Sequence, residues 1–446
     1  RRRNRSGKKV TCHIRGKCLL VGRIEESRNR RVSHVSHYLR YLAGRPSFTN
    51  ISNASMIVSL ENAIHPILSL KYMWSKGRFA MADVSEVKIE GFPGRHWHKL
   101  DDGRIQCDVC PRECRLQDGQ RGLCFVRARS GDLIVLTTYG RSSGYCIDPI
   151  EKKPLNHFLP GTPVLSFGTA GCNLTCKFCQ NWDISKSREM DRLMDQATPE
   201  QIALAAEATG CRSVAYTYND PTIFLEYAID VGEACRARRI KNVAVTAGYI
   251  KAAARENFFS VMDAANVDLK AFTASFYKSL CTAELAEVLD TLVYLKNETD
   301  VWFEITNLLI PGENDSEAEI EEMTQWVVEN LGPDVPMHFT AFHPDFRMRD
   351  KPCTPPDTLF RAWRIARKNG VHYAYTGNIH DKATGSTYCH GCGLRLIGRD
   401  WHLLDDWGLT QSGLCSRCGE ACAGVFEDRP GDWGRKRQSV RLADFA

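Results

Sequence analysis

The chain has 446 residues, of which 43% are hydrophobic and 25% charged, and it carries 19 cysteines and a formal net charge of +6. That length suffices for about two to four domains, and the composition excludes a disordered, collagen-like or coiled-coil chain. The best candidate for a membrane span, residues 56–70, is shorter than the roughly 18 residues required and contains Glu61, His65 and Pro66. No membrane association is therefore expected.

The positive charge lies at the N-terminal end alone. Residues 1–80 contain 17 lysines and arginines but three acidic residues, a net charge of +14, so the rest of the chain has a net charge of −8. This basic segment is either an arm for nucleic acid or a membrane surface, or an extension upstream of a working protein that starts at Met81. We favour the extension, so the net charge gives no reason to expect nucleic-acid binding.

Most of the cysteines fall into three groups with short spacings. Such spacings suit metal ions or clusters better than disulfides, and in a long, enzyme-like chain they indicate a reducing, cytoplasmic location. Isolated cysteines such as Cys281 are expected to be small core residues. The groups are the front quartet (Cys107, Cys110, Cys114, Cys124), the central triplet (Cys172, Cys176, Cys179) and the ribbon quartet (Cys389, Cys392, Cys415, Cys418).

Between residues 160 and 376, strand-like apolar runs alternate with helical stretches. Two helix starts are marked by capping signatures, Thr198–Gln201 and Ser316–Glu319. This alternation implies parallel strands and an α/β fold, a full or partial (β/α) barrel with its site at the carboxyl ends of the strands. The predicted strands are Val164–Phe167, Ser213–Tyr218, Asn242–Thr246, Asn266–Leu269, Val301–Leu309, Met337–Ala341 and Val371–Tyr375.

Small cysteine-rich modules are predicted on both sides of this barrel. The expected order is a basic extension (1–80), a cysteine-rich segment (81–155), the barrel (156–380), a ribbon-like module (381–426) and a polar, peripheral tail (427–446).

The central triplet is the most specific chemical signal. It has C-x3-C-x2-C spacing on the loop after the first barrel strand, with no obvious fourth cysteine. A four-iron cluster held by three thiolates leaves one iron open, and that iron can chelate the amino and carboxylate groups of S-adenosylmethionine (SAM). Phe178 would shield the cluster or pack against adenine. A zinc knuckle or chance spacing is the alternative, and a strand directly before the loop argues against both.

This pattern resembles that of the radical SAM superfamily. Three neighbouring runs, Asp148–Leu155, His157–Thr162 and Gly168–Leu174, resemble its glycyl-radical-enzyme-activase-like branch, within which the AmmeMemoRadiSam-system radical SAM enzymes fit best. The resemblance implies a [4Fe-4S] cluster on the central triplet and reductive cleavage of SAM to a 5′-deoxyadenosyl radical. It also implies an electron donor such as flavodoxin or ferredoxin, and Memo-type and AMMECR-type partner proteins.

The resemblance further implies residues that contact SAM. Asn219 and Asp220 follow the second strand, where the superfamily has an acidic motif for the SAM amino group, although relatives often carry glutamate there; capping of the next helix is the alternative. Asp268 and Lys270 look like the activases' Asp-x-Lys element, which contacts SAM near its ribose or carboxylate; the alternative is that they form a surface ion pair. His343 would line the cofactor or substrate cavity; the alternative is that its role is purely structural.

The two quartets suggest further metal sites. The ribbon quartet consists of two C-x2-C pairs, each followed by glycine, a pattern typical of a structural zinc ribbon; a second iron–sulfur cluster is the less favoured alternative. The front quartet is compatible with zinc, with an auxiliary iron–sulfur cluster or with no metal.

Three hypotheses for function follow. The leading one is a radical SAM enzyme that abstracts hydrogen from an unidentified substrate. The second is an activating enzyme that installs a glycyl radical on a partner enzyme, as in pyruvate formate-lyase activation. The third is a zinc-binding interaction protein with an inactive barrel, which the intact triplet disfavours.

Overall fold

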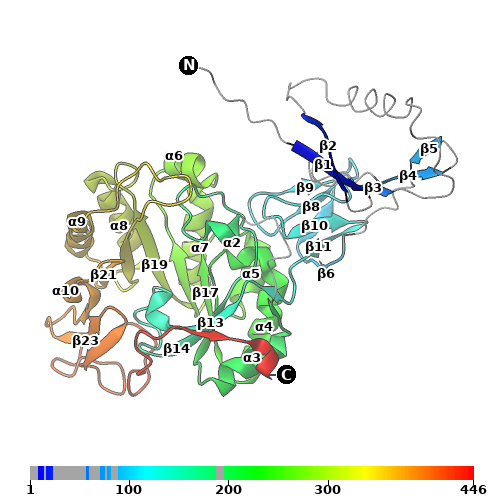
Figure 1. Cartoon of the computed structure of the whole chain (residues 1–446). Coiled ribbons are helices and arrows are strands. Elements are labelled where there is room, and N and C mark those ends of the chain that lie inside the picture. The colour runs from blue at the N-terminus through cyan, green and yellow to red at the C-terminus, as the bar shows by residue number, and fades with distance from the viewer. Residues whose placement is uncertain are drawn as a thin grey trace. The chain divides into compact units, whose positions relative to one another are not determined.

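The computed structural model describes residues 89–186 and 195–445, together with the backbone of five short strands before residue 82 (Figure 1). The chain divides into two units, Arg1–Val87 and Lys88–Ala446. In the first unit β1 pairs with β2, and β3, β4 and β5 form an antiparallel sheet. Apart from these strands, the predicted basic extension lies outside the described residues. The strands are β1 Lys9–Ile14, β2 Lys17–Arg23, β3 Ile57–Ser59, β4 Lys71–Ser75 and β5 Arg78–Met81.

The second unit is built on a nine-stranded sheet in the order β21-β20-β19-β18-β17-β16-β14-β13-β25. The seven strands from β21 to β14 run parallel, whereas β13 and β25 are antiparallel. This mixed, mostly parallel and open sheet is consistent with a partial barrel. The strands are β13 Tyr145–Pro149, β14 Pro163–Phe167, β16 Ser213–Tyr216, β17 Lys241–Thr246, β18 Ala264–Asp268, β19 Trp302–Leu309, β20 Met337–Ala341, β21 Ala374–Gly377 and β25 Gln438–Val440.

Six predicted strands agree with the structure to within two residues at each end. The seventh was predicted three residues too early, because the Val371 amide donates to the Ala366 carbonyl and so closes the preceding helix. The tail, predicted to be polar and peripheral, supplies the edge strand β25, which pairs with β13. A three-residue edge strand is held by backbone hydrogen bonds, which leave little trace in the side-chain pattern.

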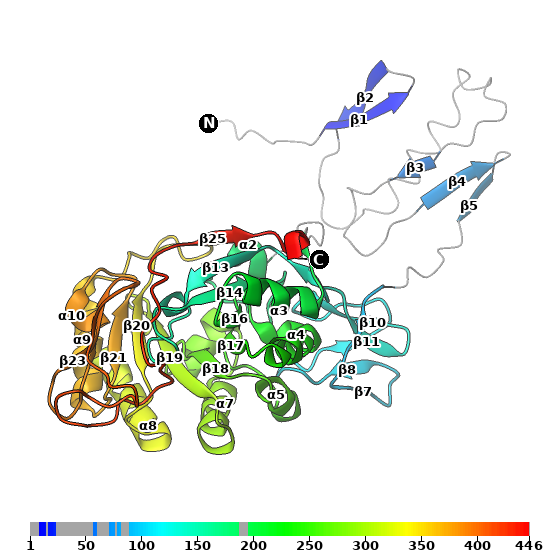
Figure 2. The ribbon, with the colours of Figure 1, turned by 90° about the horizontal axis from the view of Figure 1, so that it is seen from below.

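The longer helices cover one face of the sheet (Figure 2). Both predicted capping residues are confirmed: the Thr198 and Ser316 side chains accept hydrogen bonds from the Gln201 and Glu319 amides. No described helix is long and apolar enough to cross a membrane. The helices are α2 Trp182–Ser185, α3 Pro199–Ala208, α4 Leu225–Ala237, α5 Ala252–Phe259, α6 Ala274–Phe276, α7 Leu285–Glu298, α8 Glu317–Leu331, α9 Pro356–Lys368 and α10 Lys382–Gly385, with single turns η2 Ile150–Lys152, η4 Pro221–Phe224, η5 Tyr277–Cys281 and η6 Leu442–Phe445.

The opposite, inner face of the sheet is covered near the amino ends of the strands by the segment that precedes β14. Near the amino ends of the strands, Val164 and Ala215 pack against Phe158 from the segment that precedes β14. At the same end Glu304 is fully buried; its carboxylate accepts from the His157 amide at 2.7 Å and pairs with the His338 ring at 2.6 Å. The inner face is therefore closed near the amino ends, so a site is expected at the carboxyl ends.

The front cysteine-rich segment is anchored to the helical layer. It contains two small three-stranded sheets, and its Arg127 forms a doubly hydrogen-bonded ion pair with Glu226 of α4 at 2.7 and 2.8 Å. Both side chains are almost entirely buried. The small strands are β6 Phe92–Pro93, β7 Trp97–Lys99, β8 Ile105–Cys107, β9 Arg115–Leu116, β10 Arg127–Ser130 and β11 Leu133–Leu136, and β12 Arg141–Ser142 pairs with β15 Asp195–Gln196.

The ribbon module is attached to the other end of the sheet through a buried histidine. His157 Nδ1 donates to the Ala423 carbonyl at 2.6 Å, and its Nε2 accepts from the Tyr375 hydroxyl of β21 at 2.5 Å. The module's sheet consists of β22 Thr387–Tyr388, β23 Arg395–Asp400 and β24 Leu403–Trp407.

Candidate radical SAM site

The loop that carries the central triplet follows β14 directly. It is held in place by backbone hydrogen bonds, since Thr175 donates to the Cys281 carbonyl at 3.1 Å and Lys177 donates to the Leu280 carbonyl at 2.9 Å. Both acceptors belong to η5, a turn of π-helix. An element about 100 residues further along the chain therefore fixes the conformation of the triplet loop.

Each of the three sulfur atoms has a polar partner. The Leu174 amide donates to Cys172 Sγ at 3.5 Å. A hydrogen bond from the Cys281 thiol lowers the pKa of Cys176 to about 6 in spite of its burial, and Lys270 lowers it further. Cys179 Sγ lies 3.0 Å from the hydroxyl of Ser185 on α2. A thiol that ionises this readily suits metal ligation, which requires the thiolate. Cys281 is buried, as expected for a core residue, but it is also part of this site.

The residue before the triplet must be glycine. Gly171 has a φ of +84°, and a β-carbon at this position would lie 2.0 Å from the carbonyl oxygen of Cys124. The Asn219 side chain fixes the same turn, because it donates to the Gly171 carbonyl at 2.8 Å and accepts from the Thr169 amide at 3.1 Å. In the structure Asn219 thus positions the triplet loop, and its contact with SAM stays a prediction.

Asp220 performs the capping role that was the alternative prediction. Its carboxylate accepts from the Thr222 amide, the Thr246 hydroxyl and the Ala247 amide, each at 3.0 Å. Burial raises its pKa, which these hydrogen bonds oppose. Its contact with the SAM amino group stays a prediction.

Asp268 and Lys270 meet at the carboxyl end of β18. Lys270 Nζ donates to Asp268 at 2.8 Å and lies 5.9 Å from the centre of the buried Phe178 ring. Burial lowers the pKa of Lys270, but Asp268 and the thiols of Cys176 and Cys281 outweigh it, so the pKa is raised well above its usual value. The lysine side chain is 14% exposed, so the pair is no ordinary surface ion pair.

His343 lies apart from this group. It is exposed on the loop that follows β20. Its role in lining the cavity stays a prediction.

The residues present fit a cofactor at the carboxyl ends of the strands. Three thiols come from one loop, and two buried hydroxyl oxygens nearby, those of Thr169 and Thr306, have no hydrogen-bond partner among the described residues. Thr306 pairs with Asp268 in the sheet ladder. Buried polar atoms without partners are costly unless a ligand satisfies them.

The ribbon quartet has the geometry of a tetrahedral metal site. All four sulfur atoms lie within 4.8 Å of one another, and the Cys389–Cys418 and Cys392–Cys415 pairs are 3.5 and 3.6 Å apart. Four sulfurs at the usual zinc–sulfur distance would be separated by about 3.8 Å. The quartet can therefore bind a metal such as zinc.

Comparisons with known proteins identify the family. A model of the radical SAM superfamily matches residues 167–326, which include the central triplet. The chain is 38% identical over 326 residues to the uncharacterized protein MJ0808 of Methanocaldococcus jannaschii, covering 73% of this chain and 96% of that protein. The chain belongs to the radical SAM superfamily. The hypothesis of an interaction protein with an inactive barrel is thereby set aside.

Solved structures of radical SAM proteins resemble the chain more remotely. A domain of a pyruvate-formate lyase-activating enzyme from Bacteroides vulgatus is 17% identical, with 37% of this chain and 99% of that chain covered and a TM-score of 0.34. A radical SAM methyltransferase from Sphaerobacter thermophilus is 16% identical, with 64% and 76% covered and a TM-score of 0.38.

As a radical SAM enzyme, the chain generates a 5′-deoxyadenosyl radical from SAM with the [4Fe-4S] cluster typical of the superfamily. The protein's own contribution is to present three thiols from a rigid loop and to place a buried cation, Lys270, next to one of them, Cys176. The protein thus orients its cofactors, which carry the difficult chemistry.

Sequence reasoning missed several residues that hold the triplet loop. Arg112, in the front segment, donates from Nε to the Asn173 carbonyl at 2.8 Å and from Nη2 to the Thr282 hydroxyl at 2.9 Å. Lys186 donates to the Leu174 carbonyl at 2.7 Å. No local pattern reveals such contacts, because each joins segments that are brought together only by folding.

Proposed function

We propose that this radical SAM enzyme binds SAM between the central triplet and the Asp268–Lys270 pair, and that the resulting radical abstracts hydrogen from a substrate held at the carboxyl ends of the strands. The observation that carries the proposal is the position of Lys270, which faces Phe178 and influences Cys176 while it is paired with Asp268. A buried lysine beside the triplet loop can donate a charge-assisted hydrogen bond to the carboxylate of SAM.

The proposal places the chain in the activase-like branch, among the AmmeMemoRadiSam-system enzymes. The runs around Asp148 and Gly168 support this branch. The proposal includes a low-potential donor such as flavodoxin or ferredoxin, Memo-type and AMMECR-type partners, and a cytoplasmic location. The alternative target is a backbone glycine of a partner enzyme, but the ribbon module and the cysteine-rich front segment favour a different substrate.

For the ribbon quartet we propose a structural zinc ion. The sulfur spacings of 3.5 and 3.6 Å support it, as do the left-handed glycines Gly393 and Gly419 that close the two turns. Since all four ligands come from the protein, such an ion has no open position for catalysis.

The experiment is anaerobic reconstitution of the full chain with iron and sulfide, followed by dithionite and SAM. We expect 5′-deoxyadenosine from the wild type and none from Cys176→Ala. Lys270→Met should raise the KM for SAM by about 10- to 100-fold, the cost of one charge-assisted hydrogen bond. Lys177→Met is the matched control, because Lys177 is an exposed lysine of the same loop.

The outcomes separate the proposals. Undiminished 5′-deoxyadenosine from Cys176→Ala would sink the assignment of the cluster ligands, and an unchanged KM in Lys270→Met would remove this lysine from the SAM site. The alternative target predicts a persistent glycyl-radical signal on a partner polypeptide in electron paramagnetic resonance after turnover.

A further inference from the structure

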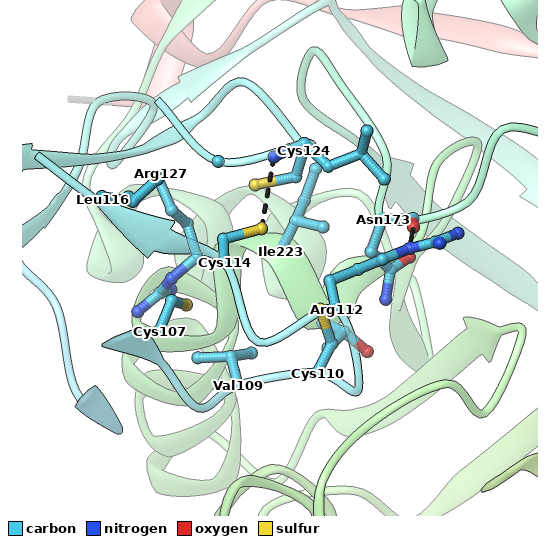
Figure 3. Close-up of a pocket in the computed structure, with 13 residues that line it drawn as sticks. Cys107, Val109, Cys110, Arg112, Cys114, Leu116, Cys124, Arg127, Asn173 and Ile223 are labelled. Carbon is cyan, nitrogen blue, oxygen red and sulfur yellow. Dashed lines mark hydrogen bonds between the residues drawn. The ribbon is translucent and has the colours of Figure 1, made fainter. Parts of the chain in front are cut away.

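The front quartet lines a pocket. Its four cysteines come from β8 and the loops on either side of β9, and they line one small pocket that is partly open to solvent (Figure 3). Arg112 and Asn173 lie at one side of this pocket, and Arg127 at another. Residues that are 17 apart in sequence, Cys107 and Cys124, are therefore gathered around one space.

The spacing of the sulfur atoms distinguishes this site from the ribbon. In the ribbon quartet all four sulfurs lie within 4.8 Å of one another, as a single zinc ion requires. Over residues 89–186 and 195–445, neither the front quartet nor the central triplet contains three sulfurs that close together. The front quartet therefore resembles the iron–sulfur ligands of this same chain rather than its zinc-like site.

Two buried polar groups of the pocket lack partners. Thr222 is fully buried and Arg127 is 2% exposed. The Thr222 hydroxyl and the Nε of Arg127 make no hydrogen bond among the described residues, although Arg127 uses its other two nitrogens to bind Glu226. Unpaired buried donors are costly, and the sulfur atoms of an iron–sulfur cluster accept such hydrogen bonds.

We propose that the front quartet ligates a second [4Fe-4S] cluster, with one thiolate on each iron. The four thiols, which are spaced more widely than the ribbon cysteines, and the two unpartnered donors together suit a group larger than a single ion. Because all four irons would be held by protein, this cluster would not bind SAM.

The site lies directly beside the radical SAM loop. The Cys124 carbonyl packs against Gly171, the residue before Cys172, and Arg112 joins the quartet's loop to Asn173 within the triplet. Loss of the second cluster should therefore loosen the support of the first one.

The test is metal analysis of the full chain after anaerobic reconstitution. The wild type should contain about eight iron and eight sulfide per chain, for two clusters, and one zinc. The Cys172→Ala/Cys176→Ala/Cys179→Ala variant should keep about four iron, and its reduced paramagnetic resonance signal should not change when SAM is added. Adding Cys110→Ser to this triple variant should remove the remaining iron and leave the zinc. Cys235→Ala, at a buried cysteine outside every group, is the control.

The opposite results are equally clear. A triple variant without iron but with two zinc ions would show that the front quartet is a zinc site, and one without iron and with a single zinc would show that it binds no metal. Both overturn the proposal, and neither depends on whether quartet variants fold. Failure of the proposed function would instead show as missing 5′-deoxyadenosine from a wild type that holds its full iron.

Discussion

Replacement of Gly171 by alanine tests whether the front segment supports the radical SAM loop. The β-carbon that this substitution adds would lie 2.0 Å from the Cys124 carbonyl oxygen and 3.3 Å from Val126. Because non-bonded heavy atoms settle more than about 3 Å apart, the loop or the front segment must move by about 1 Å. The φ of +84° adds about 1 kcal/mol of backbone strain for a residue other than glycine.

A displacement of this size matters because Cys172 is the next residue. A misplacement of about 1 Å near a reacting centre can lower a rate by about 100-fold. We therefore expect Gly171→Ala to lower 5′-deoxyadenosine formation at saturating SAM by about that factor, with the largest part of the loss in the rate rather than in the KM. The assay is chromatographic quantification of 5′-deoxyadenosine, with iron content measured on the same samples.

Gly210→Ala is the matched control. Gly210 follows α3 with a φ of +73°, and a β-carbon there would meet nothing within 4 Å. This variant should lose about 1 kcal/mol of unfolding free energy and stay within twofold of the wild-type rate. If both variants cleave SAM equally well, the contact between Gly171 and Cys124 does not hold the loop and the reasoning fails.

Three further predictions concern stability and metal content. Arg127→Met should lower the free energy of unfolding, measured with denaturant, by about 3–5 kcal/mol, because it leaves the buried Glu226 carboxylate unpaired. The double variant Arg127→Met/Glu226→Leu should recover most of this loss. A loss below about 1 kcal/mol in the single variant would contradict the ion pair's role. Burial lowers the pKa of His157 to about 4 in the folded protein, whereas histidines of the unfolded chain titrate near about 6.5. As the pH falls, the unfolded chain therefore takes up this proton first. Acidification from about pH 6.5 to about pH 4 should lower the free energy of unfolding by about 3 kcal/mol. His157→Asn should flatten this pH dependence, and an equal slope in both proteins would speak against it. Cys415→Ser should remove one zinc per chain and leave the iron unchanged, whereas loss of iron would place an iron–sulfur cluster in the ribbon.

The sequence by itself determined the features that depend on local patterns. The spacing of the central triplet after an apolar strand was enough to indicate the superfamily, and the capping residues Thr198 and Ser316 marked where two helices begin. The ribbon quartet was visible as two short cysteine pairs. Each of these features is encoded within about 30 consecutive residues, so no knowledge of long-range contacts was needed.

Only the tertiary structure decided how the cysteine groups relate to one another. The packing of Cys124 on Gly171 joins segments that are 47 residues apart in the sequence, and the hydrogen bond from the Cys281 thiol to Cys176 joins segments that are 105 residues apart. The distances between the sulfur atoms of the front quartet are likewise set by how its loops pack around the pocket. The sequence pattern of these cysteines is compatible both with zinc and with an iron–sulfur cluster. Metal preference depends on the distances between sulfur atoms, and those distances are set by the packing of loops that no local periodicity describes.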